Sequence, residues 1–521
     1  MNSRWLLALA LAGLMASPVA SAQEQDPSPD TTDNAWPKTR ISFTFGHENV
    51  LVKPGETKES VPGALFGACD KSILARTTSQ ECGGVAANLV LYKRLTFSKT
   101  FQPEAALSLR IRASDSGADM DDNGSYLRLN YFLSPSHDKF WALTLFPVDA
   151  DRMRLGYHYD VSWGGTDSFP KNFRRGAAPG LKFDLDYKYW HFFVGAKGAL
   201  VRSPADDILD NPGGNTLKNV VRVFYGGLAG FGVEFMDTGL RLEMNGGIFN
   251  KGTNTRQNAI GQDILAGGVS GRLSYRFGMP IGRQIDIRLY QQDPIRSELF
   301  EKENYKGGKF SMAAEIEGTF LIQSLEDPDR VNSTRNEQSW MSHVGFAMKY
   351  GHFRMHLHAI YRDLTAILFD VPGFVPYQAL PENTETSGEI YASLAADYNI
   401  QPIDLTIGLK FGLLKPATYN GIVPAGTTAS STDQGRRKVV VRGSGTGDWD
   451  ILPAGEDELL VFSTELSVKW SFYDFFAVVG EISYERDDNV AQVIQDAQGH
   501  NVRVFDEPNR LGFMILSEML F

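Results

Sequence analysis

Apolar and polar residues alternate along many short stretches of the chain. In residues 181–188, apolar side chains at odd positions interleave with charged ones at even positions, and residues 240–245, 272–277, 285–289 and 403–411 repeat the pattern. A period of two is that of a β-strand with one apolar and one polar face. The pattern therefore predicts an all-β protein.

Long polar connections alternate with short ones between the predicted strands. The first strand, expected at Thr39–His47, is followed by the polar segment 48–84, and the second, expected at 85–97, by the short link 98–102. A polar loop at 114–124 follows the third strand. Bacterial barrels show this rhythm because their periplasmic turns are short and their extracellular loops are long. The rhythm therefore predicts a transmembrane antiparallel β-barrel.

The number of strands is predicted from the same rhythm. Counting gives nineteen strands, whereas a barrel with both termini on one side has an even number. The rhythm is irregular between Gln291 and Gln338, where one strand is either missed or added, unless Arg152–Val161 is misassigned. About eighteen strands, within a range of roughly 16–20, are therefore expected, and a barrel of that size has room for water in its lumen.

Aromatic side chains gather at the short links. Amphipathic aromatic rings are enriched where a membrane meets water. The clustering therefore predicts an interfacial girdle at the rim that carries the short turns. Its members are Phe97, Phe101, Tyr187, Tyr189, Trp190, Tyr350, Phe353, Trp470, Phe472, Tyr473, Phe475 and Phe476.

The last twelve residues, Arg510–Phe521, read R-L-G-F-M-I-L-S-E-M-L-F. On an extended strand the apolar side chains at odd positions share one face, interrupted only by Ser517, and Glu518 lies on the other. With its terminal Phe521, this stretch resembles the closing strand of Gram-negative outer-membrane β-barrels of the porin-like class, in which the last aromatic residue serves assembly. The resemblance implies contact with outer-membrane lipid and insertion by the barrel assembly machinery.

The N-terminus has the features of an export signal. Arg4 precedes the eleven-residue apolar run Trp5–Met15, and small residues at positions 20–22 form a cleavage site. Such a run is too short to span a bilayer as a helix. We expect a signal peptide at 1–22, a flexible periplasmic segment at 23–38 and a barrel over 39–521. Neither end then leaves room for a separate plug domain.

Composition and charge restrict the partners further. Hydrophobic residues make up 42% of the chain and glycines number 51, and the mean hydropathy stays low because strand alternation dilutes the apolar content. The formal net charge of −11 argues against nucleic acid, since phosphate binding needs clustered positive charge.

The two cysteines, Cys69 and Cys82, share the polar segment after the first strand. In an exported chain such a pair is expected to form a disulfide, which would stabilise the fold by about 3 kcal/mol. A metal or redox pair is the alternative, although no histidine lies nearby.

If the apolar faces contact lipid, the polar faces line the lumen. Many of their charges are expected to pair across neighbouring strands. A modest excess of bases in the first half favours anionic or carbohydrate solutes. The candidate bases are Arg110, Arg112, Arg128, Arg222, Arg241, Arg272, Arg276, Arg288, Arg354 and Arg362, and the candidate acids are Asp184, Asp186, Glu243, Asp286, Asp404, Glu465, Glu481 and Glu485.

The connection Asp149–Gly180 is one of the longest in the first half of the chain and carries Arg174 and Arg175. The resemblance to porins implies that such a loop can fold into the barrel. Arg174 and Arg175 would then be the charges of a constriction.

Two groups of residues are candidates for metal binding. Asp119, Asp121 and Asn123 match the opening of a calcium loop, but Asn130 stands where the loop needs its glutamate, and a solvated acidic hairpin loop is the alternative. No other cofactor is expected.

A tight turn at residues 351–352 would bring His343, His356 and His358 together in the lumen. Three imidazoles can hold a transition metal. A mixed polar lining is the alternative.

Local motifs of catalysis are absent, since the chain contains no G-x-S-x-G, H-E-x-x-H or P-loop pattern. We therefore expect no enzyme, but an outer-membrane channel for small polar solutes. One alternative is a barrel subunit of a larger envelope machine for polysaccharide export, secretion or surface motility, with periplasmic or envelope partner proteins. A less favoured alternative is an outer-membrane hydrolase.

Overall fold

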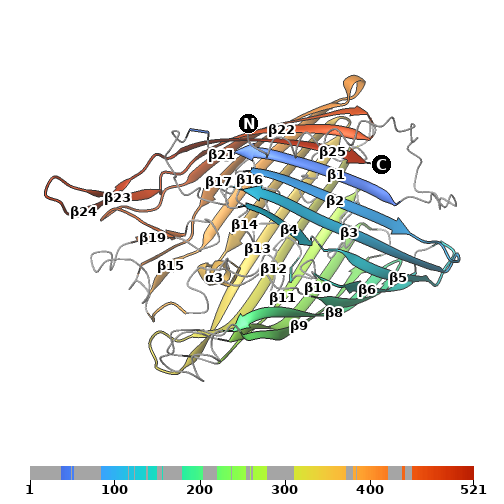
Figure 1. Cartoon of the computed structure of the whole chain (residues 1–521), viewed down its shortest axis with the longest axis horizontal. Coiled ribbons are helices and arrows are strands. Elements are labelled where there is room, and N and C mark those ends of the chain that lie inside the picture. Colours follow the sequence, from blue (N-terminus) through green and yellow to red (C-terminus); the bar gives the residue numbers. More distant parts are fainter. Residues whose placement is uncertain are drawn as a thin grey trace.

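A computed structural model describes the fold. The residues described are 37–47, 50–51, 84–114, 117–122, 124–136, 139–148, 155–156, 179–203, 220–235, 238–253, 259, 262–278, 310–370, 379–382, 384–420, 437–440, 449–473 and 475–520. In this part of the chain one antiparallel sheet closes on itself as a barrel (Figure 1). No helix there is long and apolar enough to cross a membrane.

The barrel wall is made of strands that pair with their neighbours in sequence. They are β1 (Lys38–His47), β2 (Gly84–Arg94), β3 (Phe101–Ser114), β4 (Gly117–Asp122), β5 (Tyr126–Phe132), β6 (Phe140–Phe146), β7 (Gly180–Tyr187), β8 (Trp190–Ser203), β9 (Val220–Glu234), β10 (Leu240–Thr253), β11 (Asp263–Phe277), β12 (Phe310–Glu326), β13 (Thr334–Tyr350), β14 (Phe353–Arg362), β16 (Glu389–Ile400), β17 (Leu405–Lys415), β21 (Val461–Tyr473), β22 (Phe476–Arg486) and β25 (Asn509–Leu520).

The first and last strands close the barrel. β25 pairs with β22 on one side and with β1 on the other, where Phe45 stands opposite Ile515. A sheet that crosses a bilayer has to close, because lipid cannot satisfy the backbone groups of a free edge. The terminal strand predicted from Leu511 onward is therefore confirmed as a wall strand, while Phe521 itself lies outside the described residues.

Two short strands share one position in the wall. β4 pairs with the later half of β3 and β5 with its earlier half, so β4 and β5 together form a single stave. The sheet of 19 strands is thus a barrel of 18 staves in the described part of the chain. The expected even number is confirmed.

The two faces of the wall differ as the alternation predicts. On β5, Leu127 and Leu129 are exposed on the outside, whereas Asn130 is buried and Arg128 lies on the same inner face. An outward apolar belt suits lipid, and inward polar side chains suit an aqueous or hydrogen-bonded interior.

Aromatic rings form a girdle at the rim that carries the short turns, as expected. Tyr187 stacks on Trp190 with ring centroids 4.5 Å apart, and Tyr473 on Phe475 at 5.3 Å. Tyr350 is also exposed there. These residues flank the tight turns of the β7–β8, β21–β22 and β13–β14 hairpins. The position of the girdle identifies this rim as one membrane–water interface.

The opposite rim carries additional elements. The helix α3 (Leu364–Asp370) follows β14 at this rim. The 3-10 turn η3 (Gln401–Ile403), by contrast, belongs to the short-turn rim, where it joins β16 to β17. A small sheet is formed by β15 (Glu385–Ser387), β18 (Thr418–Asn420), β19 (Arg437–Val440) and β20 (Trp449–Ile451). A hairpin of β23 (Ala491–Gln495) and β24 (Asn501–Phe505) projects away from the barrel (Figure 1).

Several predicted boundaries are wrong. The polar loop expected at 114–124 contains β4, so the wall continues through it. In the region 291–338, where the rhythm is irregular, the described residues 310–338 form the long strand β12 and the start of β13. β11 ends at Phe277 and β12 begins at Phe310, so the connection between them is long although it belongs to the short-turn rim. The strand predicted at 285–289 lies outside the described residues.

The small sheet at the long-loop rim is held by charges. Arg437 of β19 donates to Glu458, and Lys415 Nζ lies 3.6 Å from the same carboxylate. Burial alone would raise the pKa of Glu458, but hydrogen bonds from Arg437 and from its own backbone, with the positive charges of Arg437 and Lys415, lower this pKa below 4.5. A carboxyl with a lowered pKa stabilises the fold above its ordinary pKa, and the contribution is lost as the pH falls through the lowered value.

We therefore expect the small sheet to be firm near neutral pH and to loosen below pH 4.5, the ordinary pKa of the Glu458 carboxyl. The Glu458→Gln variant should be looser already at neutral pH and should change little in the acid range. Hydrogen exchange of the β19 amides, corrected for its intrinsic pH dependence, measures both. Equal protection of the wild type at neutral and acid pH would contradict the role of Glu458.

Candidate functional site: the inner face of the barrel

The inner face carries charges on successive strands. On β10, Arg241, Glu243 and Asn245 point inward and are buried, whereas Leu242 and Met244 between them point outward and are exposed. A charged side chain inside a membrane-spanning wall is costly unless it is paired or solvated. The partners of these charges therefore decide what the interior can do.

A buried network centres on Arg272 of β11. Its Nε donates to Glu243 Oε2 over 3.0 Å, and its Nη1 lies 3.4 Å from Glu315 Oε2 of β12. His191 Nε2 of β8 lies 3.5 Å from the other oxygen of Glu243, whose side chain is 0% exposed. The network crosses from β8 to β12, so the wall is tied by charge as well as by backbone hydrogen bonds.

A second network lies nearer the short-turn rim. Glu234 of β9 accepts from Arg241 over 3.1 Å and from Arg276 over 2.7 Å. Towards β5, Arg128 lies 3.9 Å from Asp184, which also pairs with Lys182.

The other half of the wall repeats the arrangement. Arg354 Nε of β14 donates to Asp397 Oδ1 of β16 over 3.1 Å, and both side chains are almost completely buried. Arg362 pairs with Glu389 at 2.7 Å. Lys410 pairs with Glu465, and Arg510 with Glu485. The interior is thus a belt of ion pairs around the lumen.

These pairs correct the expected charge bias. Arg128, Arg241, Arg272, Arg276 and Arg354 each have a carboxylate within 4.0 Å, so they do not present a row of uncompensated bases. The prediction that lining charges pair across neighbouring strands therefore agrees with these ion pairs of the described residues. Several of the acidic partners were not predicted from the sequence, although all of them stand at alternating positions on wall strands. They are Glu234, Glu315, Glu389 and Asp397.

Asp186, Glu243 and Arg272 lie on the inner face as expected, but other candidates can be placed only by their backbone. Arg110 and Arg112 belong to β3, opposite Asp121 and Asp119 of β4. Arg222 belongs to β9. The side chains of these residues lie outside the described part, as do the residues Arg174, Arg175, Arg288, Asp286, Cys69, Cys82 and Asn123.

The proposed calcium sequence sits on a wall strand and its bulge. Asp119 and Asp121 belong to β4, and the carboxylate of the next acid, Asp122, accepts from the backbone N–H groups of Gly124 and Ser125, both at 3.1 Å. Gly124 has a φ of +85°, which suits glycine. This turn inserts one residue opposite β3, because Leu109 pairs with Asp122 and Ala106 with Tyr126. The acidic sequence therefore shapes the wall at this point.

The three histidines do lie together on the inner face. His343 Nε2 and His358 Nδ1 are 3.2 Å apart, and the His356 ring stacks on that of His358 with centroids 6.3 Å apart. The tight turn predicted at 351–352 is confirmed, since Tyr350 pairs with Phe353. The described residues contain no group of three or more His, Cys, Asp or Glu side chains placed to hold a metal ion.

The inner face is not polar throughout. Buried apolar side chains from neighbouring strands form a cluster, many of them near the long-loop rim, where β6 ends at Phe146 and β21 begins at Val461. The expected polar conduit is therefore polar only in part. The cluster comprises Tyr92, Ala106, Tyr126, Phe146, Leu155, Phe193, Leu228, Phe249, Ala266, Leu321, Met341, Ile360, Ala366, Tyr391, Leu414 and Val461.

Part of the connection between β6 and β7 reaches this interior. Gly156 N donates to the inward-facing Asn245 Oδ1 of β10 over 3.2 Å, and Leu155 is completely buried. A Cβ placed on Gly268 of β11 would lie 2.7 Å from Leu155 Cδ2. Leu155 therefore packs against a wall position that has no side chain. Residues 155–156 lie inside the barrel, as the constriction hypothesis requires of this connection.

The closed barrel, the apolar outer belt, the aromatic girdle and the charged inner face together define an outer-membrane β-barrel protein of porin-like architecture. The assignment to this class is based on these features of the barrel and on no other protein.

Comparison with known proteins adds similarity of overall fold only. No family model and no curated protein matches the chain. Pseudomonas aeruginosa OccK2 (OpdF) aligns with a TM-score of 0.41 and 8% identity over 93% of this chain and 98% of that chain. P. aeruginosa OccD3 (OpdP) aligns with a TM-score of 0.43 and 8% identity over 94% of this chain and 91% of that chain. The P. aeruginosa outer membrane protein opdK aligns with a TM-score of 0.43 and 8% identity over 93% of this chain and 98% of that chain.

Proposed function

We propose that this barrel is an outer-membrane channel for small polar solutes. One observation carries the proposal: a belt of charged side chains runs along the inner face of a closed barrel, on strands whose outer faces are apolar. Charges at membrane depth are costly and are kept where they line a path or a cavity. We propose no catalytic activity.

Charge pairing supports a particular selectivity. Since Arg272 is compensated by Glu243 and Glu315, and Arg241 and Arg276 by Glu234, the described lining favours neutral polar solutes such as carbohydrates. A preference for anions would require uncompensated bases elsewhere, and Arg174 and Arg175 are the candidates.

The test is the conductance of the purified protein in planar bilayers. We expect discrete channel openings. The paired charges of the described lining, acting alone, would give a reversal potential near zero in a potassium chloride gradient. If Arg174 and Arg175 form the charged constriction, the wild type should prefer chloride and the Arg174→Ala/Arg175→Ala variant should not. Equal selectivity of the two proteins would remove the constriction role, and the absence of any conductance would remove the channel.

A barrel subunit of a larger envelope machine is the second candidate. It is favoured by the burial of most inner-face side chains in the described part, such as Lys197, Glu317 and Asp397, which leaves little wall in contact with water. Recovery of the same periplasmic protein in stoichiometric amount after mild detergent extraction would support this candidate, provided that the purified barrel alone does not conduct.

A further inference from the structure

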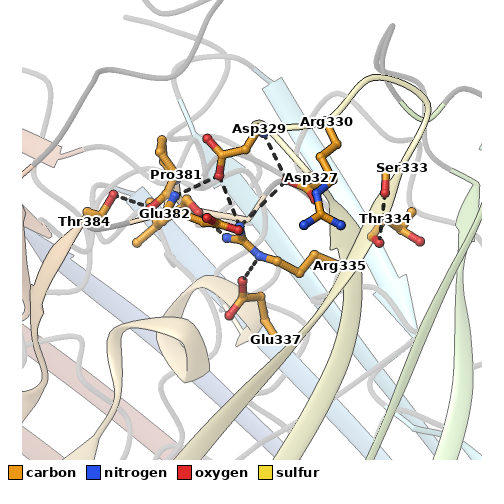
Figure 2. A network of polar contacts seen from close by, with 11 residues as sticks. Asp327, Asp329, Arg330, Ser333, Thr334, Arg335, Glu337, Pro381, Glu382 and Thr384 are labelled. Carbon is orange, nitrogen blue, oxygen red and sulfur yellow. Dashed lines mark hydrogen bonds and ion pairs between the residues drawn. The ribbon is translucent and has the colours of Figure 1, made fainter.

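Arg335, at the start of β13, binds several carboxylates at once (Figure 2). Its guanidinium lies 2.6 Å from Glu337, 3.2 Å from Asp329 and 3.7 Å from Asp327. It also lies 4.0 Å from Glu382 and donates to the carbonyl oxygen of Leu380.

These contacts join two separate segments of the long-loop rim. Asp327 and Asp329 belong to the turn between β12 and β13, whereas Leu380 and Glu382 belong to the segment that leads to β15. Two backbone groups strengthen the junction: Ala379 N donates to the Glu326 carbonyl over 2.9 Å, and Glu382 N donates to Asp329 Oδ2 over 2.8 Å. Residues 379–382 are thereby fixed to the end of the β12–β13 hairpin.

The helix α3 lies inside the barrel. Ala366 and Ile367 are completely buried, and Ala366 belongs to the same apolar cluster as the inward-facing Met341 and Ile360. The start of the helix is fixed by Asp363, whose N–H donates to the Trp340 carbonyl over 3.0 Å and whose carboxylate accepts from Trp340 N over 2.8 Å. The described residues on either side of α3 are therefore both fixed, Asp363 at the β13 wall and residues 379–382 at Arg335 and the end of β12.

Arg335 is the central cation of this junction. Four carboxylates, from Asp327, Asp329, Glu337 and Glu382, lie within 4.0 Å of it. The other cation, Arg330, reaches only Asp327, at 3.9 Å, and its side chain is 72% exposed. Removal of Arg335 would leave like charges facing one another between the two segments, which separates them.

We propose that Arg335 is the positioning residue of a constriction in which α3 narrows the lumen near the long-loop rim. The proposal rests on the channel function proposed above. The carboxylate cluster around Arg335 clamps the far end of the α3 connection, and the clamp keeps the helix packed on the inner face of β13. The width of the path at this level is then set by a charge cluster at the rim.

The experiment compares Arg335→Gln with Arg330→Gln, which changes the neighbouring exposed cation of the same turn. Two readouts are needed: hydrogen exchange of the Ala379 and Glu382 amides, and single-channel conductance in planar bilayers. Loss of the clamp should speed exchange of both amides about tenfold and raise conductance roughly twofold. Arg330→Gln should leave both values at the wild-type level.

Two results would overturn the proposal. Unchanged exchange in Arg335→Gln would show that the cluster does not hold the segment, and faster exchange with unchanged conductance would show that α3 does not narrow the path. If neither the wild type nor any variant conducts, although amide exchange is still faster in Arg335→Gln, the proposed channel function is refuted, and the constriction proposal with it. Should Arg335→Gln fail to fold, Asp329→Ala removes one carboxylate and the acceptor of the Glu382 amide, and the same results are expected.

Discussion

Replacement of Arg354 by methionine is expected to destabilise the barrel by about 3–5 kcal/mol, since it removes the ion-pair partner of a buried carboxylate. Arg354 and Asp397 are 1% and 0% exposed, and the bond between them is 3.1 Å long. The Arg354→Met/Asp397→Leu double variant, which removes both charges, should regain most of the loss. The stability of both variants is measured by chemical unfolding in detergent, with the folded and unfolded fractions separated by their electrophoretic mobility.

The matched control is Arg486→Met. Arg486 also pairs with a carboxylate, Asp488, at 2.9 Å, but its side chain is 56% exposed. Solvent screens such a pair, so little or no loss of stability is expected. A cost for Arg354→Met as small as that of the control would show that the interior is wet enough to solvate Asp397. The belt of ion pairs would then have to be interpreted as an open aqueous lining.

The Gly268→Ala variant is expected to lose about 1–3 kcal/mol of stability through overpacking and to change the single-channel conductance. The added Cβ would lie 2.6 Å from the carbonyl oxygen of Phe320 and 2.7 Å from Leu155. The backbone carbonyl cannot yield easily, so the added methyl group should displace Leu155 from the wall. Planar-bilayer recording detects the displacement if residues 155–156 border the path.

Gly271→Ala on the same strand is the control. Gly271 faces outward, and the nearest atom to its added Cβ would be Met244 Cγ at 3.9 Å, an ordinary contact. We expect the stability to stay within about 0.5 kcal/mol and the conductance to stay unchanged. If both glycine variants conduct like the wild type, the segment around Leu155 has no part in the path.

The period of two was sufficient to predict the wall. It assigned the faces of β5, β7 and β10 correctly, because alternation is a local consequence of one lipid-facing side. The connection rhythm alone gave nineteen strands, and the rule that a barrel with both termini on one side has an even number led to the confirmed value of eighteen. The rhythm is irregular at two places. The connection after β11 is long at the short-turn rim, and the Asp122–Gly124 turn breaks one stave into two strands.

The interior could be predicted only in part. Alternation indicates that Glu243 and Arg272 point inward, but their pairing depends on the register between strands, which the turns set and the pattern does not. The apolar run at 364–369 has no period that separates a helix from a strand. Arg335 and Leu380 are 45 residues apart in sequence, so no local signal connects them. Contacts between loops need the whole barrel to bring them together.

The wall strands differ greatly in length. β12 and β13 have 17 residues each, whereas β5 and β6 have 7. A tilted strand needs about 9–11 residues to cross the hydrocarbon layer, so the two long strands extend beyond the lipid by roughly six residues, or about 20 Å measured along the tilted strand. The β12–β13 hairpin thus projects beyond the membrane on the long-loop side. A molecule bound at the tip of this hairpin would lie farther from the membrane surface than one bound beside Phe146, at the end of the short strand β6.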